Sequence, residues 1–211
     1  MLIGPLLARA LVGFGPLSSD ALAAWSERTK ERRFDAHSFL LRAGERAEWC
    51  FLLISGLVRE YYVDESGAEH TRSFIPEGGA TGSLLDLLSG EPALTFIEAL
   101  EPTHVLAFRY SDFDALSQRF ADIGHIARRN AEALYARKAR REHEMLALGA
   151  SARHERWLAE NAALDARITR RQLASHLGVT PEHLSRLRQQ AASRQGAAPS
   201  SRKPSPAGRA R

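Results

Sequence analysis

The sequence of 211 residues predicts an α+β protein with an N-terminal β jelly-roll, a long central helix and a C-terminal helix-turn-helix. Three patterns support this fold class. Between residues 34 and 110, short apolar segments alternate with turns at the spacing of a small barrel or jelly roll. Residues 121–148 form one continuous helical stretch, and residues 168–190 divide into two short helices around a tight turn.

The first expected element is a short helix over residues 18–30, which Ser18 or Ser19 can cap. Strands follow, and residues 58–63 show the two alternating sets of side chains of a half-buried strand. Asp64–Gly67 predicts a hairpin connection, because Gly67 can adopt a positive φ. The expected strands lie within the segments 39–45, 50–63, 70–76, 94–100 and 103–110.

The long helix carries residues at alternating three- and four-residue spacing, which is typical of a coiled-coil seam. The seam runs through Phe120, Ile123, Ala127, Asn130 and Leu134, and its continuation meets Arg137 and Arg141, which are poor core residues. Two interpretations stay open. The helix pairs with a second copy, which we favour, or it is an ordinary amphipathic helix on its own domain. Gly149 ends the stretch.

The C-terminal pair of helices turns at Gly178, where a positive φ is needed. Thr180 can cap the second helix, and Pro181 suits its first position because a missing N–H costs nothing there. Ala174 is small where the helices must cross closely. One apolar surface spans both helices and consists of Ile168, Leu173, Leu177, Val179, Leu184 and Leu187. This spacing favours a helix-turn-helix over a hairpin used only for packing.

The outward face of the second helix carries residue types that recognise DNA bases. Glu182 can accept a hydrogen bond from cytosine N4, and Arg186 can donate two to guanine. Thr169 and Arg170, near the start of the first helix, are expected at phosphates. The predicted DNA-binding residues are Thr169, Arg170, Thr180, Pro181, Glu182, Ser185, Arg186 and Arg188.

The charge distribution agrees with a polyanionic partner. The net charge is +4, but from residue 151 onward twelve lysines and arginines stand against four acidic residues. The competing interpretation is a solvated basic surface with a basic tail. After Gln190 the sequence is of low complexity and is predicted to be disordered.

Composition excludes several other classes of protein. With 44% hydrophobic and 26% charged residues, the chain is expected to be globular, and no apolar run reaches the roughly 18 residues of a membrane span. Cys50 is the only cysteine, which excludes an internal disulfide and any metal site built from several cysteines. His37, His70 and His104 are dispersed, so we expect no metal and no cofactor. No nucleophile–base constellation stands out, and we expect no enzymatic activity.

In this order, the predicted parts resemble the Crp/Fnr family of bacterial transcription regulators. The resemblance covers about residues 10–190 and rests on the segments 43–45, 54–58, 64–67, 78–98 and 168–188. It implies a cyclic-nucleotide-binding-like sensor domain, a dimerisation helix and a winged-helix-like helix-turn-helix, with Pro181, Glu182 and Arg186 facing the bases. The family usually has an arginine where this chain has Pro181, and little strand-like sequence is present here for the wing.

The glycine-rich stretch GGATGSLLDLLSGEPALTFIE, residues 78–98, occupies the place of the family's nucleotide-binding loop. In the cyclic-nucleotide-binding members of the family that this chain resembles, a glutamate stands at the position of Ser83 and binds the ribose. Arg-Ser stands at the positions of Ala93 and Leu94, and that arginine pairs with the cyclic phosphate. Between Arg72 and Arg109 the sequence has five acidic residues and no lysine or arginine, which disfavours a bound phosphate. Only Arg59, Arg72 or Arg109, on neighbouring strands, could contact a phosphate bound at this loop.

We therefore expect a different effector, of unknown identity, or none. The candidate pocket residues are Gly82, Ser83, Leu84, Ala93, Leu94 and Asn130.

The expected domains are the sensor over residues 1–115, the dimerisation helix over 116–148, the helix-turn-helix domain over 149–191 and a disordered basic tail over 192–211. The expected function is that of a cytoplasmic, homodimeric, sequence-specific DNA-binding transcription regulator. Its partners would be double-stranded DNA, a second copy and, for an activator, RNA polymerase, with no membrane partner. One alternative is a cyclic-nucleotide-responsive regulator. Another is a ligand-binding or protein-interaction module without DNA-directed regulation.

Overall fold

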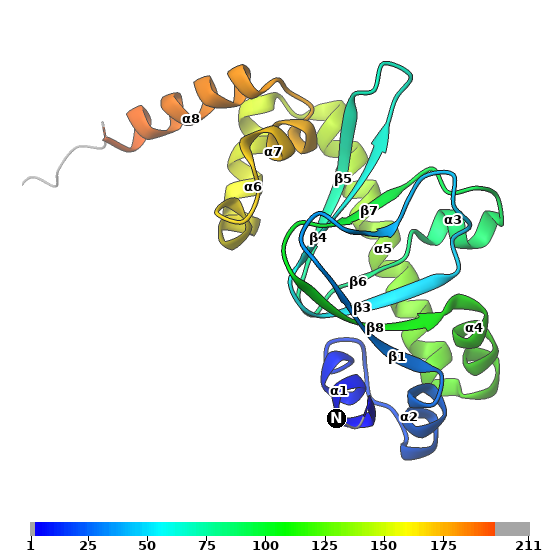
Figure 1. Cartoon of the computed structure of the whole chain (residues 1–211). Coiled ribbons are helices and arrows are strands. Elements are labelled where there is room, and N and C mark those ends of the chain that lie inside the picture. The colour runs from blue at the N-terminus through cyan, green and yellow to red at the C-terminus, as the bar shows by residue number, and fades with distance from the viewer. Residues whose placement is uncertain (1–2, 197–211) are drawn as a thin grey trace, which may run out of the picture.

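Two four-stranded antiparallel sheets form the centre of the protein, as a computed structural model that describes residues 3–196 shows (Figure 1). One sheet has the strand order β1-β8-β3-β6 and the other the order β2-β7-β4-β5. The strands are β1 Thr29–Phe34, β2 Phe39–Leu41, β3 Trp49–Ser55, β4 Leu57–Val63, β5 Glu69–Pro76, β6 Ala80–Thr81, β7 Phe96–Ala99 and β8 Thr103–Arg109. This arrangement is the jelly roll that the sequence predicts.

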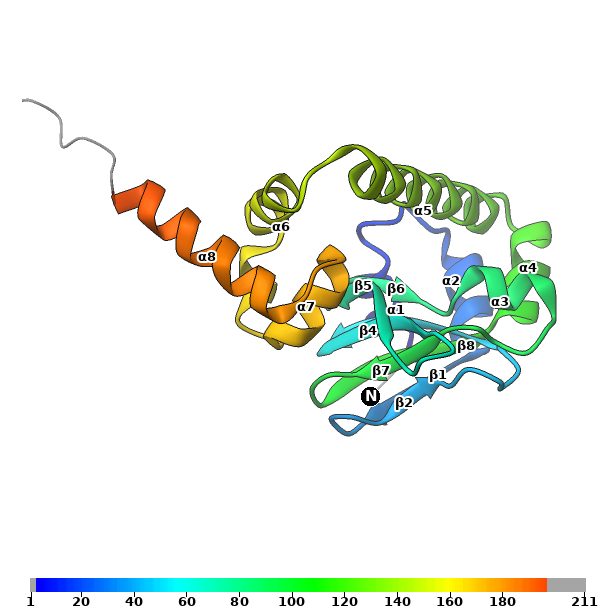
Figure 2. The ribbon, with the colours of Figure 1, turned by 90° about the horizontal axis from the view of Figure 1, so that it is seen from above.

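Helices precede and follow the jelly roll, and one short helix lies within it. They are α1 Ile3–Ala10, α2 Ser19–Ser26, α3 Leu84–Ser89, α4 Tyr110–Arg119, α5 Ala121–Ala147, α6 Ala150–Asp165, α7 Arg170–Leu177 and α8 Pro181–Gly196. Figure 2 shows α4 at one end of the long helix α5 and the group of α6, α7 and α8 beyond its other end. No helix of the described part is long and apolar enough to cross a membrane.

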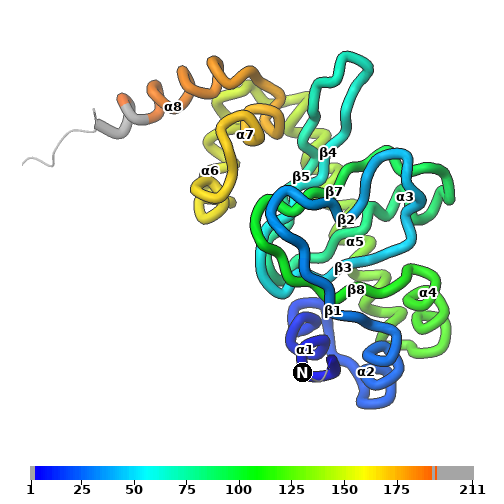
Figure 3. The backbone as a smooth tube through the Cα atoms, viewed as in Figure 1, coloured from blue at the N-terminus to red at the C-terminus, as the bar shows by residue number. Residues whose placement is uncertain are grey.

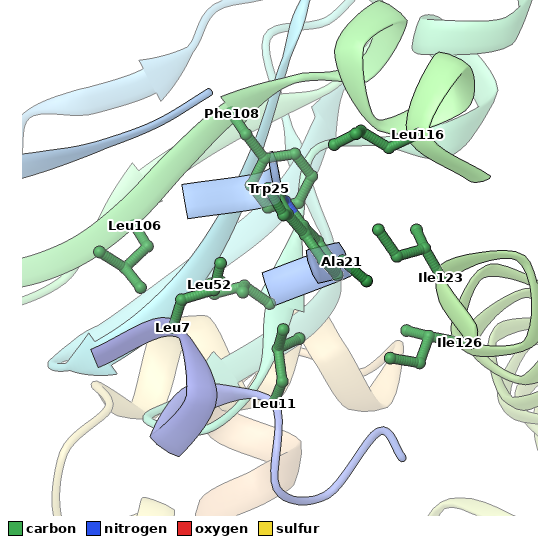
Figure 4. Close-up of a cluster of buried hydrophobic side chains, with 10 residues drawn as sticks. All are labelled: Leu7, Leu11, Ala21, Trp25, Leu52, Leu106, Phe108, Leu116, Ile123 and Ile126. Carbon is green, nitrogen blue, oxygen red and sulfur yellow. The ribbon is translucent and has the colours of Figure 1, made fainter. Parts of the chain in front are cut away.

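β3 and β8 are buried on both faces, and successive side chains serve different partners. Phe51, Leu53 and Val105 belong to the core between the two sheets. Leu52 and Phe108 point the other way and pack against the helices. Figure 4 shows this second core, in which the sheet meets Leu7, Leu11, Ala21, Trp25, Leu116, Ile123 and Ile126. The helices α1, α2, α4 and α5 are therefore fixed to the outer face of one sheet.

Three boundaries differ from those expected from the sequence. β1 begins at Thr29, inside the segment predicted to be a helix, because six residues pair with β8 and tertiary pairing outweighs local propensity. The long helix begins at Ala121, where the helical stretch in the sequence begins, and not at residue 116, where the dimerisation helix was expected to start, since Phe120 is extended (φ −116°, ψ 116°) and separates it from α4. The glycine-rich stretch contains the helix α3, which the sequence did not indicate.

The C-terminal end differs as well. α8 continues to Gly196, so residues 192–196 of the segment expected to be disordered are helical. Alanine, arginine and glutamine in that segment are good helix formers. Residues 197–211 of the predicted tail lie outside the described residues. Every strand in residues 3–196 precedes Tyr110, so α7 and α8 have no β wing there, in agreement with the scarcity of strand-like sequence.

α7 closes the free edge of β5, the outermost strand of its sheet (Figure 3). The Ser175 hydroxyl donates to the Glu69 carbonyl at 2.6 Å and accepts from the Thr71 N–H at 2.8 Å. Unpaired backbone groups at a sheet edge need partners, and here one serine of α7 satisfies two of them.

Ion pairs and aromatic rings strengthen the same contact. Arg167, just before α7, lies 2.9 Å from Glu77 and 2.6 Å from Glu101. Hydrogen bonds that Arg167 donates to these two carboxylates, with Glu101 contributing most, raise the pKa of Arg167. The rings of Phe74, Trp157 and His176 contact one another with centroids 4.8–5.6 Å apart. The C-terminal helices are therefore docked on the jelly roll by polar and apolar contacts together.

Replacing Ser175 by Ala should loosen this edge locally. The substitution leaves the Thr71 N–H and the Glu69 carbonyl without their partner, which costs about 1–3 kcal/mol for a buried group. We expect hydrogen exchange at the Thr71 amide to accelerate about tenfold or more, while the amides of β3 stay as protected as before.

The matched control is Ser193→Ala, because the Ser193 hydroxyl is exposed and bonds only within its own helix. Unchanged protection of Thr71 in the Ser175 variant would contradict the role of this contact.

Candidate nucleic-acid interface and effector cavity

The turn between α7 and α8 has the geometry that the sequence predicts. The Thr169 hydroxyl caps α7 by accepting from the Gln172 N–H, and the Gln172 side chain accepts from the Thr169 N–H in return. Gly178 has a φ of +65° and ends α7. The Thr180 hydroxyl accepts from the His183 N–H at 3.2 Å, so it caps α8, which begins at Pro181.

An apolar core holds the two helices at a fixed angle to α6. Leu173, Ala174, Leu177 and Leu184 are at most 2% exposed. They contact Trp157 and Leu164 of α6, with Ile168 and Val179 packed beside them. Leu57 of β4 belongs to the same core, so the helix-turn-helix shares apolar packing with the jelly roll. The predicted apolar surface of this motif is thus confirmed.

The opposite face of the motif is open to solvent. Thr169, Arg170, Thr180, Glu182 and Arg186 are exposed, and Pro181 and Ser185 are half-buried. Arg186 makes no hydrogen bond or ion pair within the described residues. Hydrogen bonds from its own backbone N–H and from the Thr180 hydroxyl lower the pKa of Glu182, which is therefore ionised and can only accept.

Two of the predicted DNA-binding arginines have partners inside the chain. Arg170 donates to the Ser185 hydroxyl at 3.2 Å. Arg188 lies 2.6 Å from Asp165 in an ion pair that ties α8 to the end of α6. In this arrangement Arg188 holds its own domain together. Of the two predicted DNA-binding arginines on α8, Arg186 is the one that forms no ion pair within the described residues.

A cavity of about 1060 Å³ lies between the jelly roll and α5. The candidate residues Gly82, Ser83, Leu84 and Asn130 are among those that line it. Apolar side chains of the segment after α1 and of α2, β8 and α5 contribute to its walls, among them Leu11, Phe14, Trp25, Phe108 and Ile126. Cys50 also lines it, and burial raises the pKa of this thiol to about 12, so it stays protonated.

Two candidate pocket residues lie elsewhere, and their assignment to the pocket is wrong. Ala93 is buried in the core between the sheets, where its backbone bonds to Gly44 and Glu45. Leu94 is 64% exposed on the outer surface. The reason is that the Leu94 N–H donates to the Asp86 carboxylate, which turns this end of the loop away from the cavity.

The polar wall of the cavity contains an ion pair that the sequence did not reveal. Arg72 lies 2.9 Å from Glu60, and both residues are largely buried. A bulge in the pairing of β4 with β5 places two successive residues, Arg72 and Ser73, opposite Glu60. The Ser73 hydroxyl donates to the same carboxylate at 2.7 Å, as does the hydroxyl of Thr81. Because a bulge breaks the two-residue alternation, no periodic pattern could have placed Arg72 inside.

The other two candidate arginines of the strands do not line the cavity. Arg59 pairs with Glu69 at 2.7 Å, and Arg109 pairs with Glu48 at 2.8 Å on the surface. The charge of Arg72 is matched by Glu60, which raises the pKa of Arg72 against the effect of burial. No unpaired cation from these strands therefore faces the glycine-rich loop.

Ser83 is held in an unusual conformation at the start of α3, with a φ of +47°. Its hydroxyl donates to Asp86 at 2.6 Å and lies 2.9 Å from the Thr95 hydroxyl. Burial would raise the pKa of Asp86, but hydrogen bonds from Ser83, Thr95 and Leu94 outweigh it and hold that pKa below its usual value. The loop is thus organised around its own carboxylate.

Residues 31–120 match the family model of the cyclic nucleotide-binding domain. The structure is similar to that of FixK2 from Bradyrhizobium japonicum, with 20% identity and a TM-score of 0.68 over 79% of this chain and 86% of the other. It is also similar to a Crp/Fnr-family protein from Eubacterium rectale, with 15% identity and a TM-score of 0.69 over 86% and 88%.

The chain has the Crp/Fnr fold. Among curated proteins it matches the cAMP-activated global transcriptional regulator CRP of Pasteurella multocida, with 30% identity over 91 residues. That match covers 43% of this chain and 44% of the relative, which is less than half of either. The match to the family model lies in the segment from β1 to the end of α4 and thus includes most of the jelly roll.

Replacing Glu60 by Gln tests the buried ion pair of the cavity. The substitution leaves the Arg72 guanidinium largely buried without its counter-charge, and breaking a buried pair costs about 3–5 kcal/mol. We expect the free energy of unfolding, measured by urea titration, to fall by about that amount.

Glu48→Gln is the control, because Glu48 and Arg109 are both close to half exposed and such pairs contribute about 1 kcal/mol or less. An equal fall in the free energy of unfolding in the two variants would show that the buried Glu60–Arg72 pair contributes no more to stability than the exposed Glu48–Arg109 pair.

Proposed function

We propose that the protein is a homodimeric, sequence-specific DNA-binding transcription regulator. The observation that carries this proposal is the open face of α8, where ionised Glu182 and unpaired Arg186 stand on a helix fixed by a capped turn. Because α7 and α6 bury the other side of α8, this face is the one left for a partner.

The chemistry of the face suits the major groove of DNA. Arg186 can donate two hydrogen bonds to guanine, and Glu182 can accept from cytosine. Arg170 and Thr169, exposed at the start of α7, are placed to contact phosphates. Pro181 offers no N–H and no charge, so recognition rests on fewer polar groups than an arginine there would supply.

A second copy is proposed because of how little α5 buries. Of its 27 residues, only Ile123 and Ile126 are buried, and both pack on this chain's own sensor domain. The first part of the predicted seam is therefore used within the chain. The following five turns have no buried residue, whereas helices in proteins are stabilised mostly by packing of one face. Pairing of two copies along this part would place two recognition helices about one DNA turn apart.

The sensor domain is proposed to respond to something other than a cyclic nucleotide, or to no small molecule. A cyclic phosphate needs a cation, and the one arginine from the strands that lines the cavity is neutralised by Glu60. The other cations of the lining belong to α5 and not to the glycine-rich loop or its neighbouring strands; they are Arg128, Arg137, Lys138, Arg140 and Arg141. Ser83 is engaged with Asp86 and Thr95, and Ala93 and Leu94 do not reach the cavity. The regulator is proposed to act in the cytoplasm without enzymatic activity and, as an activator, to contact RNA polymerase.

Replacing Arg186 by Ala should weaken binding to the cognate DNA by about 1–3 kcal/mol, because two hydrogen bonds to a guanine are lost. The cognate sequence comes first from selection of random duplexes by the purified full-length protein. Recovery of no shared sequence would favour a ligand-binding or protein-interaction module instead.

The affinity is then measured by titration of a labelled duplex. Arg33→Ala is the control, since Arg33 is exposed on β1, far from α8 in the chain, and removes the same charge. An unchanged affinity after loss of Arg186 would refute its role as a base contact.

The second candidate is a cyclic-nucleotide-responsive regulator. The family match over residues 31–120 favours it, and so does the presence of Arg72 in the cavity wall. We expect calorimetric titration with cyclic AMP and with cyclic GMP to give no micromolar binding. Micromolar binding of either nucleotide would overturn our interpretation of the glycine-rich loop.

A further inference from the structure

A small polar cavity lies at the joint where α5, α6 and α7 meet. Its volume is about 80 Å³, which exceeds the ~10–15 Å³ that one buried water molecule needs. It adjoins the effector cavity, with which it shares part of its lining. The lining residues are Arg141, Glu144, Arg153, Arg156, Trp157, Glu160, Asn161, His176 and Leu177.

Two polar atoms on residues of this lining are buried without a partner. Among residues 3–196, the Nε1–H of Trp157 has no hydrogen-bond acceptor, and the residue is only 7% exposed. The Nδ1 atom of His176 is also buried and has no partner in the same range. Buried polar groups in native proteins are nearly always hydrogen-bonded, so two orphans on one cavity indicate a polar occupant.

The arginines of this joint carry charge that the chain does not neutralise. Arg153 donates from Nε to the Leu177 carbonyl at 3.0 Å and from Nη1 to the Leu148 carbonyl at 2.6 Å. Arg141 donates to the His176 carbonyl. Carbonyls satisfy hydrogen bonds but leave the positive charge in place, and neither arginine has an ion pair within residues 3–196.

The carboxylates of the lining form their ion pairs with a different arginine, Arg156. Glu144 lies 3.3 Å from Arg156, and Glu160 lies 3.9 Å from the same guanidinium. Three arginines and two glutamates thus line the cavity, and the excess charge is positive. Guanidinium groups present five N–H donors each, so donors at this joint outnumber acceptors.

Two pKa values reflect the same excess. Burial lowers the pKa of Arg141, Glu144 opposes this, and the charge of Arg153 lowers it further. Burial and then the charge of Arg141 lower the pKa of His176 to about 3, so His176 is neutral at pH 7. An anion between the arginines would relieve their repulsion.

We propose that this cavity binds a small oxyanion of the phosphate or sulfate type. Arg141 and Arg153 would hold its charge, and the indole N–H of Trp157 would donate a third hydrogen bond. Because the lining comes from α5, α6 and α7, the anion would join the long helix to the helix-turn-helix and stabilise their docked arrangement. This proposal does not depend on DNA recognition.

The test is a calorimetric titration of the full-length protein with inorganic phosphate, repeated with sulfate. Trp157→Phe keeps an aromatic ring but removes the N–H, and we expect the affinity to fall about tenfold. Arg153→Lys keeps the charge but loses the fork and should also bind more weakly. Arg129→Gln is the control, because Arg129 is exposed, has no partner within the described residues and does not line either cavity.

A second measurement uses the unaltered protein and does not depend on how the variants fold. In a ¹⁵N spectrum, the indole signal of Trp157 should move on addition of phosphate. The indole signal of Trp25 should stay in place, because its Nε1–H is also unpartnered but does not belong to this lining. Binding that Arg129→Gln weakens as much as Trp157→Phe would overturn the proposal, and so would an unmoved Trp157 signal or no measurable binding.

Discussion

The packing of α5 on the outer face of β3 and β8 positions everything that follows it in the chain. Ile123 and Ile126 are at most 3% exposed, against a core that includes Leu52, Phe108 and Trp25. These contacts involve only the first two turns of a helix of 27 residues, so they act as an anchor from which the rest extends. The wall of the effector cavity, the joint with α6 and the docked helix-turn-helix all depend on this anchor. It requires that β3 and β8 be apolar on both faces, which explains their nearly continuous runs of buried residues.

Much of the fold follows from local patterns, and the exceptions have a common physical cause. The strands, the long helix and the capped turn at Gly178 are encoded by short-range spacing and turn chemistry, and these were predicted. β1 was not predicted because its charged residues do not indicate a strand. In the structure, pairing with β8 accommodates these residues, and Arg32 lies over the ring of Trp49 at 4.1 Å. The seam of α5 was assigned to a second copy, yet Phe120 and Ile123 pack within the chain. Periodicity shows that a face is apolar but does not name the surface that covers it.

The candidate sites were predictable to different degrees for the same reason. The helix-turn-helix is built from 23 consecutive residues, so its apolar and exposed faces follow from sequence alone, apart from the pairing of Arg188 with Asp165. The large cavity between the jelly roll and α5 gathers residues from the segment after α1, from α2, from several strands and from α5, and a bulge places Arg72 in it. Ala93 and Leu94 were assigned by resemblance alone, whereas here Ala93 packs between the sheets and the Leu94 N–H donates to Asp86.

The distribution of paired and unpaired cations separates structural from binding surfaces in this chain. Arg59, Arg72 and Arg167 each face a carboxylate within 3 Å, and each joins strands or domains. The charges of these three arginines are neutralised inside the fold, so they contribute little to the binding of a ligand. Within residues 3–196, Arg186 has no such partner on the open face of α8, and the guanidiniums of Arg141 and Arg153 at the joint of α5, α6 and α7 bond only to carbonyls. A net charge of +4 could not reveal this difference, because it counts cations without regard to what neutralises them. An unpaired guanidinium on a rigid element keeps its full affinity for an anion, whereas a paired one must first lose its carboxylate. Recognition of anions by this protein is therefore expected where helices present arginines that form no ion pair, and not at the glycine-rich loop that resembles a phosphate site.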